Sequence, residues 1–153
     1  MKREKDLQKV TKDQVPAAQA MQYTIERARE ALQWLKENEA EWQRKFEARE
    51  DGSQLGTRSR ILADAVAMYI ATLAEKNGSG HSLQKSYDSH KFIDEFCALP
   101  IVKKCQLNRH NRSAHESKSY GFFVSPKDIL ESNLEQWLSD ATLFVCVVGE
   151  QVK

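Results

Sequence analysis

The sequence predicts an all-α protein, an antiparallel bundle of four principal helices in which the first helix is the longest. Apolar residues recur at helical steps of three and four, whereas the alternation typical of strands is almost absent. Glycine and proline are few, at 6 and 3 residues. The 153 residues, 41% of them hydrophobic, suit one domain with a substantial core. We therefore expect a flexible arm of mixed charge over residues 1–14 and a single helical domain over residues 15–153.

The first helix is predicted to begin at Pro16, which suits a helix start, and to stop at Asp51-Gly52. Its apolar seam steps by four and three residues, as in a heptad, through Met21, Ile25, Ala28, Leu32, Leu35, Glu39, Trp42 and Phe46. About 35 residues make a helix roughly 50 Å long. A small bundle is too short to cover it, so part of the helix is expected to meet a partner. Glu39 interrupts the seam, and it either reaches water at the edge or faces Arg109 or His115 and orients it.

The second helix is predicted over Thr57–Lys76. Its expected inner face consists of Ile61, Leu62, Ala65, Met68, Tyr69, Thr72 and Leu73. A helical pair follows, interrupted or restarted at Pro100. The first helix of the pair carries an apolar stripe formed by Phe92, Ile93, Phe96 and Leu99. Apolar residues between Ile101 and Leu107 are expected to anchor the second.

The last helix is predicted from its start signals. Ser125 is a good N-cap, Pro126 a good first residue, and Asp128 stands where a capping-box acid belongs. Later in this helix, Leu143–Val148 is apolar on all sides, so it is either deeply buried or part of an interface. The aromatic residues before the helix, including Tyr120, either close the end of the bundle or stack on a base.

The segment Leu107–His115 holds two arginines, two histidines and two asparagines. Between Lys103 and Lys118 there are five basic residues and one acid, although the whole chain has a formal net charge of +1. Any attraction for phosphate must therefore be local. Arg109 and His115 are about 120° apart on a straight helix. They converge only if the helix ends or bends between them, or if a second copy of the chain supplies one of them.

Arg109, the polar His110, four further residues and then His115 resemble the signature motif of the HEPN superfamily of small helical domains. The resemblance extends over roughly residues 15–150. It implies a metal-independent endoribonuclease, a toxin or phage-defence effector that acts as a homodimer with two motifs in one cleft. In that scheme Arg109 clamps the scissile phosphate and His115 is the general acid or base on the ribose hydroxyl. Supporting roles would fall to His110, Asn111, Arg112 and Glu39.

The expected partners of such an enzyme are RNA, a second copy of the chain and an antitoxin or other protein. RNA contacts are predicted for Lys103, Lys104, Lys118 and Tyr120. The alternative is a non-catalytic helical module that binds a nucleotide or a protein, which the long heptad of the first helix supports equally well. A cleft with paired motifs would favour the nuclease, whereas an Arg109 held in a salt bridge would favour the module.

We predict no cofactor and no metal. Cys97, Cys105, His110 and His115 are suitable zinc ligands by type, but their spacing matches no familiar zinc motif. No glycine loop of the kind that cradles phosphate is present. Three cysteines do not make a disulfide framework, the N-terminus is polar, and no apolar run approaches the length of a membrane span. These features predict a reduced, cytoplasmic protein.

Overall fold

The computed structural model describes residues 2–76, 81–87, 90–114 and 124–151, and all regular secondary structure in these ranges is helical. The helices are α1 (Lys2–Glu47), α2 (Ser53–Leu73), α3 (Leu83–Ser86), α4 (Lys91–Ala98), α5 (Pro100–Ala114), α6 (Pro126–Glu131) and α7 (Leu134–Gln151). The prediction of an all-α protein is confirmed. No helix in the described ranges combines the length and apolar character needed to cross a bilayer.

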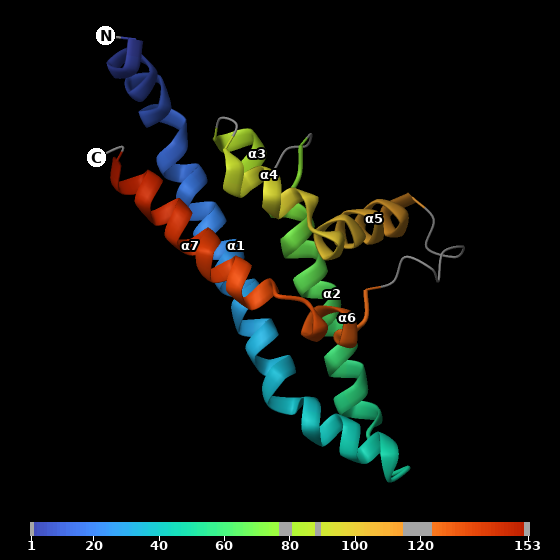
Figure 1. The fold of residues 1–153 in the computed structure, drawn as a ribbon. Helices are drawn as coiled ribbons and strands as arrows, with labels where there is room; N and C mark the ends of the chain where they lie inside the picture. The colour runs from blue at the N-terminus through green and yellow to red at the C-terminus, as the bar shows by residue number, and fades with distance from the viewer. Residues whose placement is uncertain (1, 77–80, 88–89, 115–123, 152–153) are drawn as a thin grey trace.

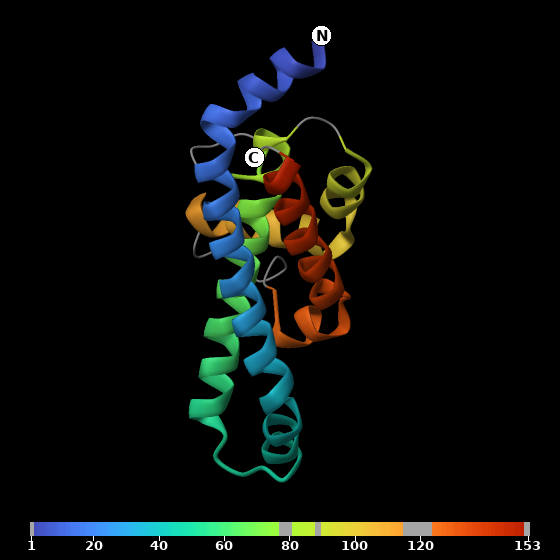
Figure 2. The ribbon, with the colours of Figure 1, turned by 90° about the vertical axis from the view of Figure 1, so that its left-hand side faces the viewer.

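The longest helices are arranged around a hairpin. In Figure 1, α1 and α2 run antiparallel, and α7 lies along α1 so that both chain termini are at the same end of the molecule. Figure 2 shows the turn between α1 and α2 at the opposite end. The helix α5 packs against α2 and crosses it, and α4 precedes α5 in the chain. The far end of the α1–α2 hairpin therefore extends beyond the remaining helices.

The helix α1 is longer than predicted. It begins at Lys2 rather than at Pro16, so Pro16 lies inside the helix. The first part of the predicted seam, Met21 through Leu35, is buried as expected. Beyond it the seam leaves the core, and the side chain of Phe46 is 75% exposed. The early start has a physical reason, because the Lys, Glu and Gln residues before Pro16 are strong helix formers.

The turn after α1 uses a left-handed residue, but that residue is not the predicted Gly52. Arg49 has a φ of 54°, whereas the φ of Gly52 is −102°. The amide of Arg49 donates to the carbonyl of Phe46 at 3.3 Å, and the amide of Glu50 donates to the carbonyl of Lys45 at 3.0 Å. This pair of bonds is the Schellman motif, which normally places glycine at the left-handed position.

Arg49→Gly is expected to raise the free energy of unfolding by about 0.5–1 kcal/mol. Glycine relieves the contact between Cβ and the backbone that left-handed geometry imposes, and the greater freedom of glycine in the unfolded chain offsets part of this gain. Urea denaturation of the two proteins measures the difference. Ala48→Gly is the matched control, because Ala48 does not have a positive φ and the change should lower stability. A loss of stability in Arg49→Gly would contradict this description of the turn.

The predicted inner face of α2 is correct only in part: Leu73 is buried and Leu62 and Tyr69 pack against the core, but Ile61 and Met68 do not. The residues that α2 buries are Gly56, Ser59, Ala63, Val66, Ala67, Ile70, Ala71 and Leu73. Ile61 and Met68 face outward, with 61% and 42% of their surface exposed. The helix carries apolar residues on several faces, and its face of small residues lets α1 approach closely. A Cβ atom at Gly56 would lie 3.3 Å from Nε1 of Trp42, so glycine permits this approach.

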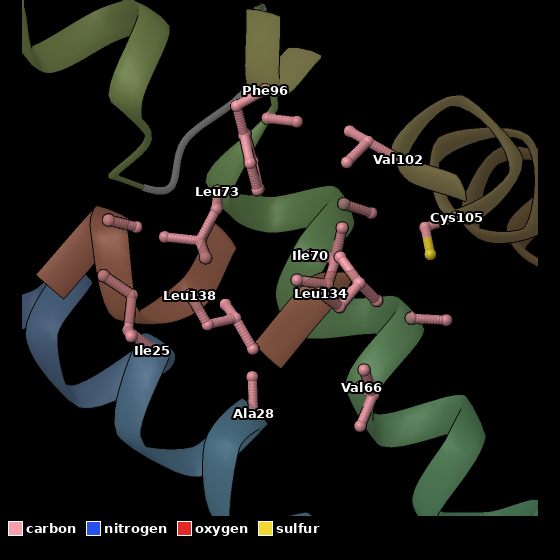
Figure 3. Packing of buried hydrophobic residues seen from close by; sticks show 14 of the residues in the cluster. Ile25, Ala28, Val66, Ile70, Leu73, Phe96, Val102, Cys105, Leu134 and Leu138 are labelled. Carbon is pink, nitrogen blue, oxygen red and sulfur yellow. The ribbon is translucent and has the colours of Figure 1, made fainter. Parts of the chain in front are cut away.

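The core lies where α1, α2 and α7 meet, and α4 and α5 close one side of it. Figure 3 shows the side chains that converge there: Ile25, Ala28, Val66, Ile70, Leu73, Phe96, Val102, Cys105, Leu134 and Leu138. Val102 and Cys105 anchor α5, as the sequence predicts. Burial raises the pKa of the Cys105 thiol to about 12, so this cysteine acts as a small apolar residue.

Two predicted helix starts are confirmed. Pro100 is the first residue of α5, and a capping box begins α6. The hydroxyl of Ser125 accepts from the amide of Asp128, and the carboxylate of Asp128 accepts from the amide of Ser125.

The predicted last helix is nevertheless two helices, because the chain leaves helical geometry at Ser132. In the segment Leu143–Val148, which is apolar on all sides in the sequence, Val145 is buried and Leu143 is 64% exposed.

Candidate functional site

Arg109 is held by Thr72 of α2 and by Glu75, which follows the end of that helix. Its Nη1 donates to Oγ1 of Thr72 at 3.2 Å, and its Nη2 lies 3.7 Å from Oε1 of Glu75. The Glu75 side chain is only 19% exposed. The guanidinium therefore joins α5 to the end of α2 and already has a carboxylate partner within the chain.

The other predicted catalytic and supporting residues are described only in part. Residues His110, Asn111 and Arg112 continue α5, which extends to Ala114. His115, Lys118 and Tyr120 lie outside the described residues. Glu39 accepts a hydrogen bond from Gln43 on the same helix at 3.2 Å. The convergence of Arg109 with His115 therefore stays a prediction.

Lys103 and Lys104, both predicted RNA contacts, have different surroundings. Lys103 is exposed on α5. Lys104 forms an ion pair of 2.8 Å with Asp128, the acid of the α6 capping box. Burial raises the pKa of Asp128, but hydrogen bonds from Lys104 and from the amide and hydroxyl of Ser125 outweigh this effect and hold the pKa below its ordinary value. Lys104 thus stabilises the start of α6.

Lys104→Met is expected to lower the free energy of unfolding at pH 7 by about 0.5–1 kcal/mol, the value of a partly exposed ion pair. The pKa of Asp128 is lower in the folded protein, so its stabilising contribution is present above the unfolded value of about 3.9 and is lost as pH falls through the folded value. The difference in the free energy of unfolding between Lys104→Met and the native protein should therefore become smaller in acid. Denaturation midpoints at pH 7 and pH 2.5 measure this change.

Lys127→Met is the control for that experiment, because Lys127 forms a more exposed pair with Glu131 at 3.7 Å. It should change stability by only a few tenths of a kcal/mol at either pH. A Lys104→Met deficit that persists undiminished in acid would show that Lys104 stabilises the fold through packing and not through Asp128.

A groove of about 1190 Å³ lies between α1 and α2 near the turn that joins them. The residues lining it are Trp34, Glu41, Lys45, Asp51, Gly52, Ser53, Gln54, Leu55, Thr57, Arg58, Ile61 and Leu62. The α1 members follow at steps of seven and four, which places them on one helix face. The groove is thus formed by one face of α1 and one face of α2, at the end of the helical hairpin that extends beyond the remaining helices.

The groove lining includes an aromatic ring from α1 and aliphatic side chains from α2. The guanidinium carbon of Arg58 lies 5.8 Å from the centre of the Trp34 ring. Leu55, Ile61 and Leu62 of α2 add apolar surface to the same lining. A guanidinium over an indole face is a favourable cation–π arrangement.

The charges along the groove balance. Lys45 and Arg58 are opposed by Glu41 and Asp51. The hydrogen bond and charge of Arg44 are the main reasons that the pKa of Glu41 lies below its ordinary value, and Lys45 lowers it further. The hydroxyl and amide of Ser53 hold the pKa of Asp51 below its usual range, again with a contribution from Lys45.

This arrangement suits binding of a flat, largely neutral heterocycle. The Trp34 ring carries the Arg58 guanidinium, the α2 side chains add apolar surface, and Gln54 and Thr57 offer hydrogen-bonding groups. Sequence reasoning missed the groove because Trp34 lies outside the heptad seam. The available signal was the spacing of Trp34, Glu41 and Lys45, but the partner face on α2 depends on how the two helices pair.

A family model described as an FAD binding domain matches residues 2–117. This range includes α1, α2, the whole groove and all of the helices as far as α5. The comparisons with curated proteins and with solved structures gave no significant match.

The family match overturns the HEPN resemblance, and with it the predictions of a ribonuclease, a toxin and a phage-defence role. It also gives no support to the alternative of a non-catalytic module. An arginine and a histidine at loose spacing carry little information, and Arg109 has a partner inside the chain. The family match supports the prediction of an enzyme, but not of a ribonuclease. RNA, a second copy and an antitoxin stay untested predictions.

Proposed function

Because this chain belongs to the FAD binding domain family, we propose that it is a flavin-binding oxidoreductase and that the α1–α2 groove is its flavin site. The observation that carries the proposal is the Trp34 ring with Arg58 at 5.8 Å, at the wall of a groove large enough for a ring system. When bound, a flavin supplies hydride and electron transfer, and the protein supplies binding and orientation.

The usual cradle for a dinucleotide is a glycine-rich turn between a strand and a helix. The described ranges contain no strand, so this chain does not offer that cradle there. The groove offers other groups that fit a flavin ring. Trp34 would provide the stacking surface, Arg58 would place positive charge near the heterocycle, and Ile61 would exclude water.

Titration of the full-length chain with FAD, followed by flavin fluorescence, tests the proposal. Saturable binding is expected, and Arg58→Met should weaken it about 5–10-fold, which corresponds to roughly 1–1.4 kcal/mol. Arg60→Met is the matched control, because Arg60 is an exposed arginine of α2 outside the groove lining. Absence of saturable FAD binding, or equal weakening by both variants, would refute the proposal.

A further inference from the structure

We infer that two copies of this chain associate through the free ends of their α1 helices, side by side and antiparallel. The surface that makes the contact is the distal seam, which we define as Glu39, Trp42 and Phe46 of α1 together with Arg49 in the turn that follows. These four residues are not part of the α1–α2 groove lining, so the inference does not depend on the proposed function.

The apolar seam of α1 continues beyond the helix that covers it. Seam residues from position 21 to position 35 are buried, and α7 packs along this part of α1. That contact ends near Lys36, which pairs with Glu135 in the first turn of α7. The seam continues through Trp42 to Phe46, where Figures 1 and 2 show α1 extending past α6 and α7 with α2 beside it. A second copy can take up the seam where α7 leaves it.

The two aromatic side chains of the distal seam form an exposed apolar surface. Their ring centres are 6.0 Å apart and their planes are 25° from parallel, so the rings stack. Trp42 is partly buried beside Gly56 of α2, whereas Phe46 is 75% exposed, more than any other large hydrophobic residue in the described ranges. Covering these rings removes apolar area from water, and aromatic side chains are enriched among the residues that dominate protein interfaces.

The spacing of the distal seam suits a two-fold pair. Trp42 and Phe46 lie two positions on either side of position 44, and Glu39 and Arg49 lie five positions on either side of it. A two-fold axis at that level therefore brings Trp42 of one copy to Phe46 of the other, and Glu39 of one copy to Arg49 of the other. The seam residues then interleave as they do in a coiled coil.

The charges of the distal seam favour a second copy over an unrelated helix. At the same end of the hairpin, Glu41 and Glu50 both pair with Arg44 inside the chain. Glu39 and Arg49 make no ion pair with any residue in the ranges that the structure describes, and Glu39 accepts only from a neighbouring glutamine. In the antiparallel pair these two charges meet twice, once on each side of the axis, so that each acid faces a cation.

Sedimentation equilibrium of the full-length chain tests the inference. An interface made by a few side chains of each copy is small, so we expect a monomer–dimer equilibrium with a dissociation constant of about 50–200 µM. At a few micromolar, the concentration suited to denaturation experiments, the chain should then be monomeric. A chain that remains monomeric up to about 500 µM, including one that uses this surface for another protein, would overturn the inference.

Phe46→Asp should weaken the association at least about tenfold, because it places a charge in the aromatic layer. The variant should keep the circular dichroism of the native chain, since Phe46 lies mostly in solvent. Leu143→Asp is the matched control, because Leu143 is 64% exposed on α7 and lies outside the distal seam. A dimer that Phe46→Asp leaves intact, or that both variants weaken equally, would contradict the assignment of the surface.

A charge exchange tests the antiparallel register. Glu39→Arg should weaken the association about 3–10-fold, because it sets arginine against arginine in both copies of the contact. Addition of Arg49→Glu to the same chain should restore the native affinity, since opposite charges face each other again. Glu47→Arg makes the same change of charge on α1 outside the distal seam and should have little effect. A double variant that associates no better than Glu39→Arg would refute this pairing of the two copies.

Discussion

Phe96→Ala is expected to lower the free energy of unfolding by about 3–5 kcal/mol, the cost of removing a large aromatic side chain from a packed core. Phe96 is fully buried on α4, and its ring centre lies 6.3 Å from the centres of both Phe92 and Trp137. It lies at the junction that Leu73 and Val102 also reach (Figure 3). A domain of this size has only about 5–15 kcal/mol in total, so the variant should unfold at much lower urea concentrations.

Phe46→Ala is the matched control for this prediction. The Phe46 side chain is 75% exposed, so its removal should change stability by no more than about 0.5 kcal/mol. Equal losses in the two variants, measured by urea denaturation with circular dichroism, would contradict the burial of Phe96 in the core beside Trp137.

Ile61→Asp is expected to weaken flavin binding about 30–100-fold while leaving the stability of the fold nearly unchanged. The new carboxylate would stand in the apolar wall and would lose hydration when a ring covers it, at a cost of about 2–3 kcal/mol. The fold should tolerate the change because Ile61 faces solvent. Flavin titration measures the affinity, and urea denaturation measures the stability.

Met68→Asp provides the control from the same helix. Met68 follows Ile61 by seven residues and shares its outward face, but it lies outside the groove lining. It is 42% exposed, so the substitution is similar in chemistry and in exposure. If Met68→Asp weakened flavin binding as much as Ile61→Asp, the loss would reflect the general charge of α2 and the groove would not be the site.

The sequence predicted the elements that depend on local chemistry. The start of α5 at Pro100 and the Ser125 capping box follow from residues adjacent in the chain. The buried seam from Met21 to Leu35 follows from the heptad spacing. The face of α2 could be predicted only in part, because apolar residues lie on several of its sides and packing selected the small ones. Arg49 could not be predicted as the left-handed residue, because glycine is preferred there.

The site depends on contacts that local patterns do not contain. Arg58 meets Trp34 only because α1 and α2 pair in one particular register. The local excess of positive charge suggested phosphate binding, but Lys104 and Arg109 pair with Asp128 and Glu75 in the folded chain. The partners of both cations lie far away in the sequence. A charge count over a short segment therefore overestimates how much charge remains for a ligand.

The indole N–H signals in a ¹H–¹⁵N NMR spectrum test most directly whether a flavin binds beside Trp34. The chain has three tryptophans, at positions 34, 42 and 137, so the signals are few enough to assign by substitution. Addition of riboflavin should shift the Trp34 signal, whereas Trp137, packed against Phe92 and Phe96, should stay in place. A saturated titration in which Trp34 does not move, or in which Trp137 moves instead, would contradict the account.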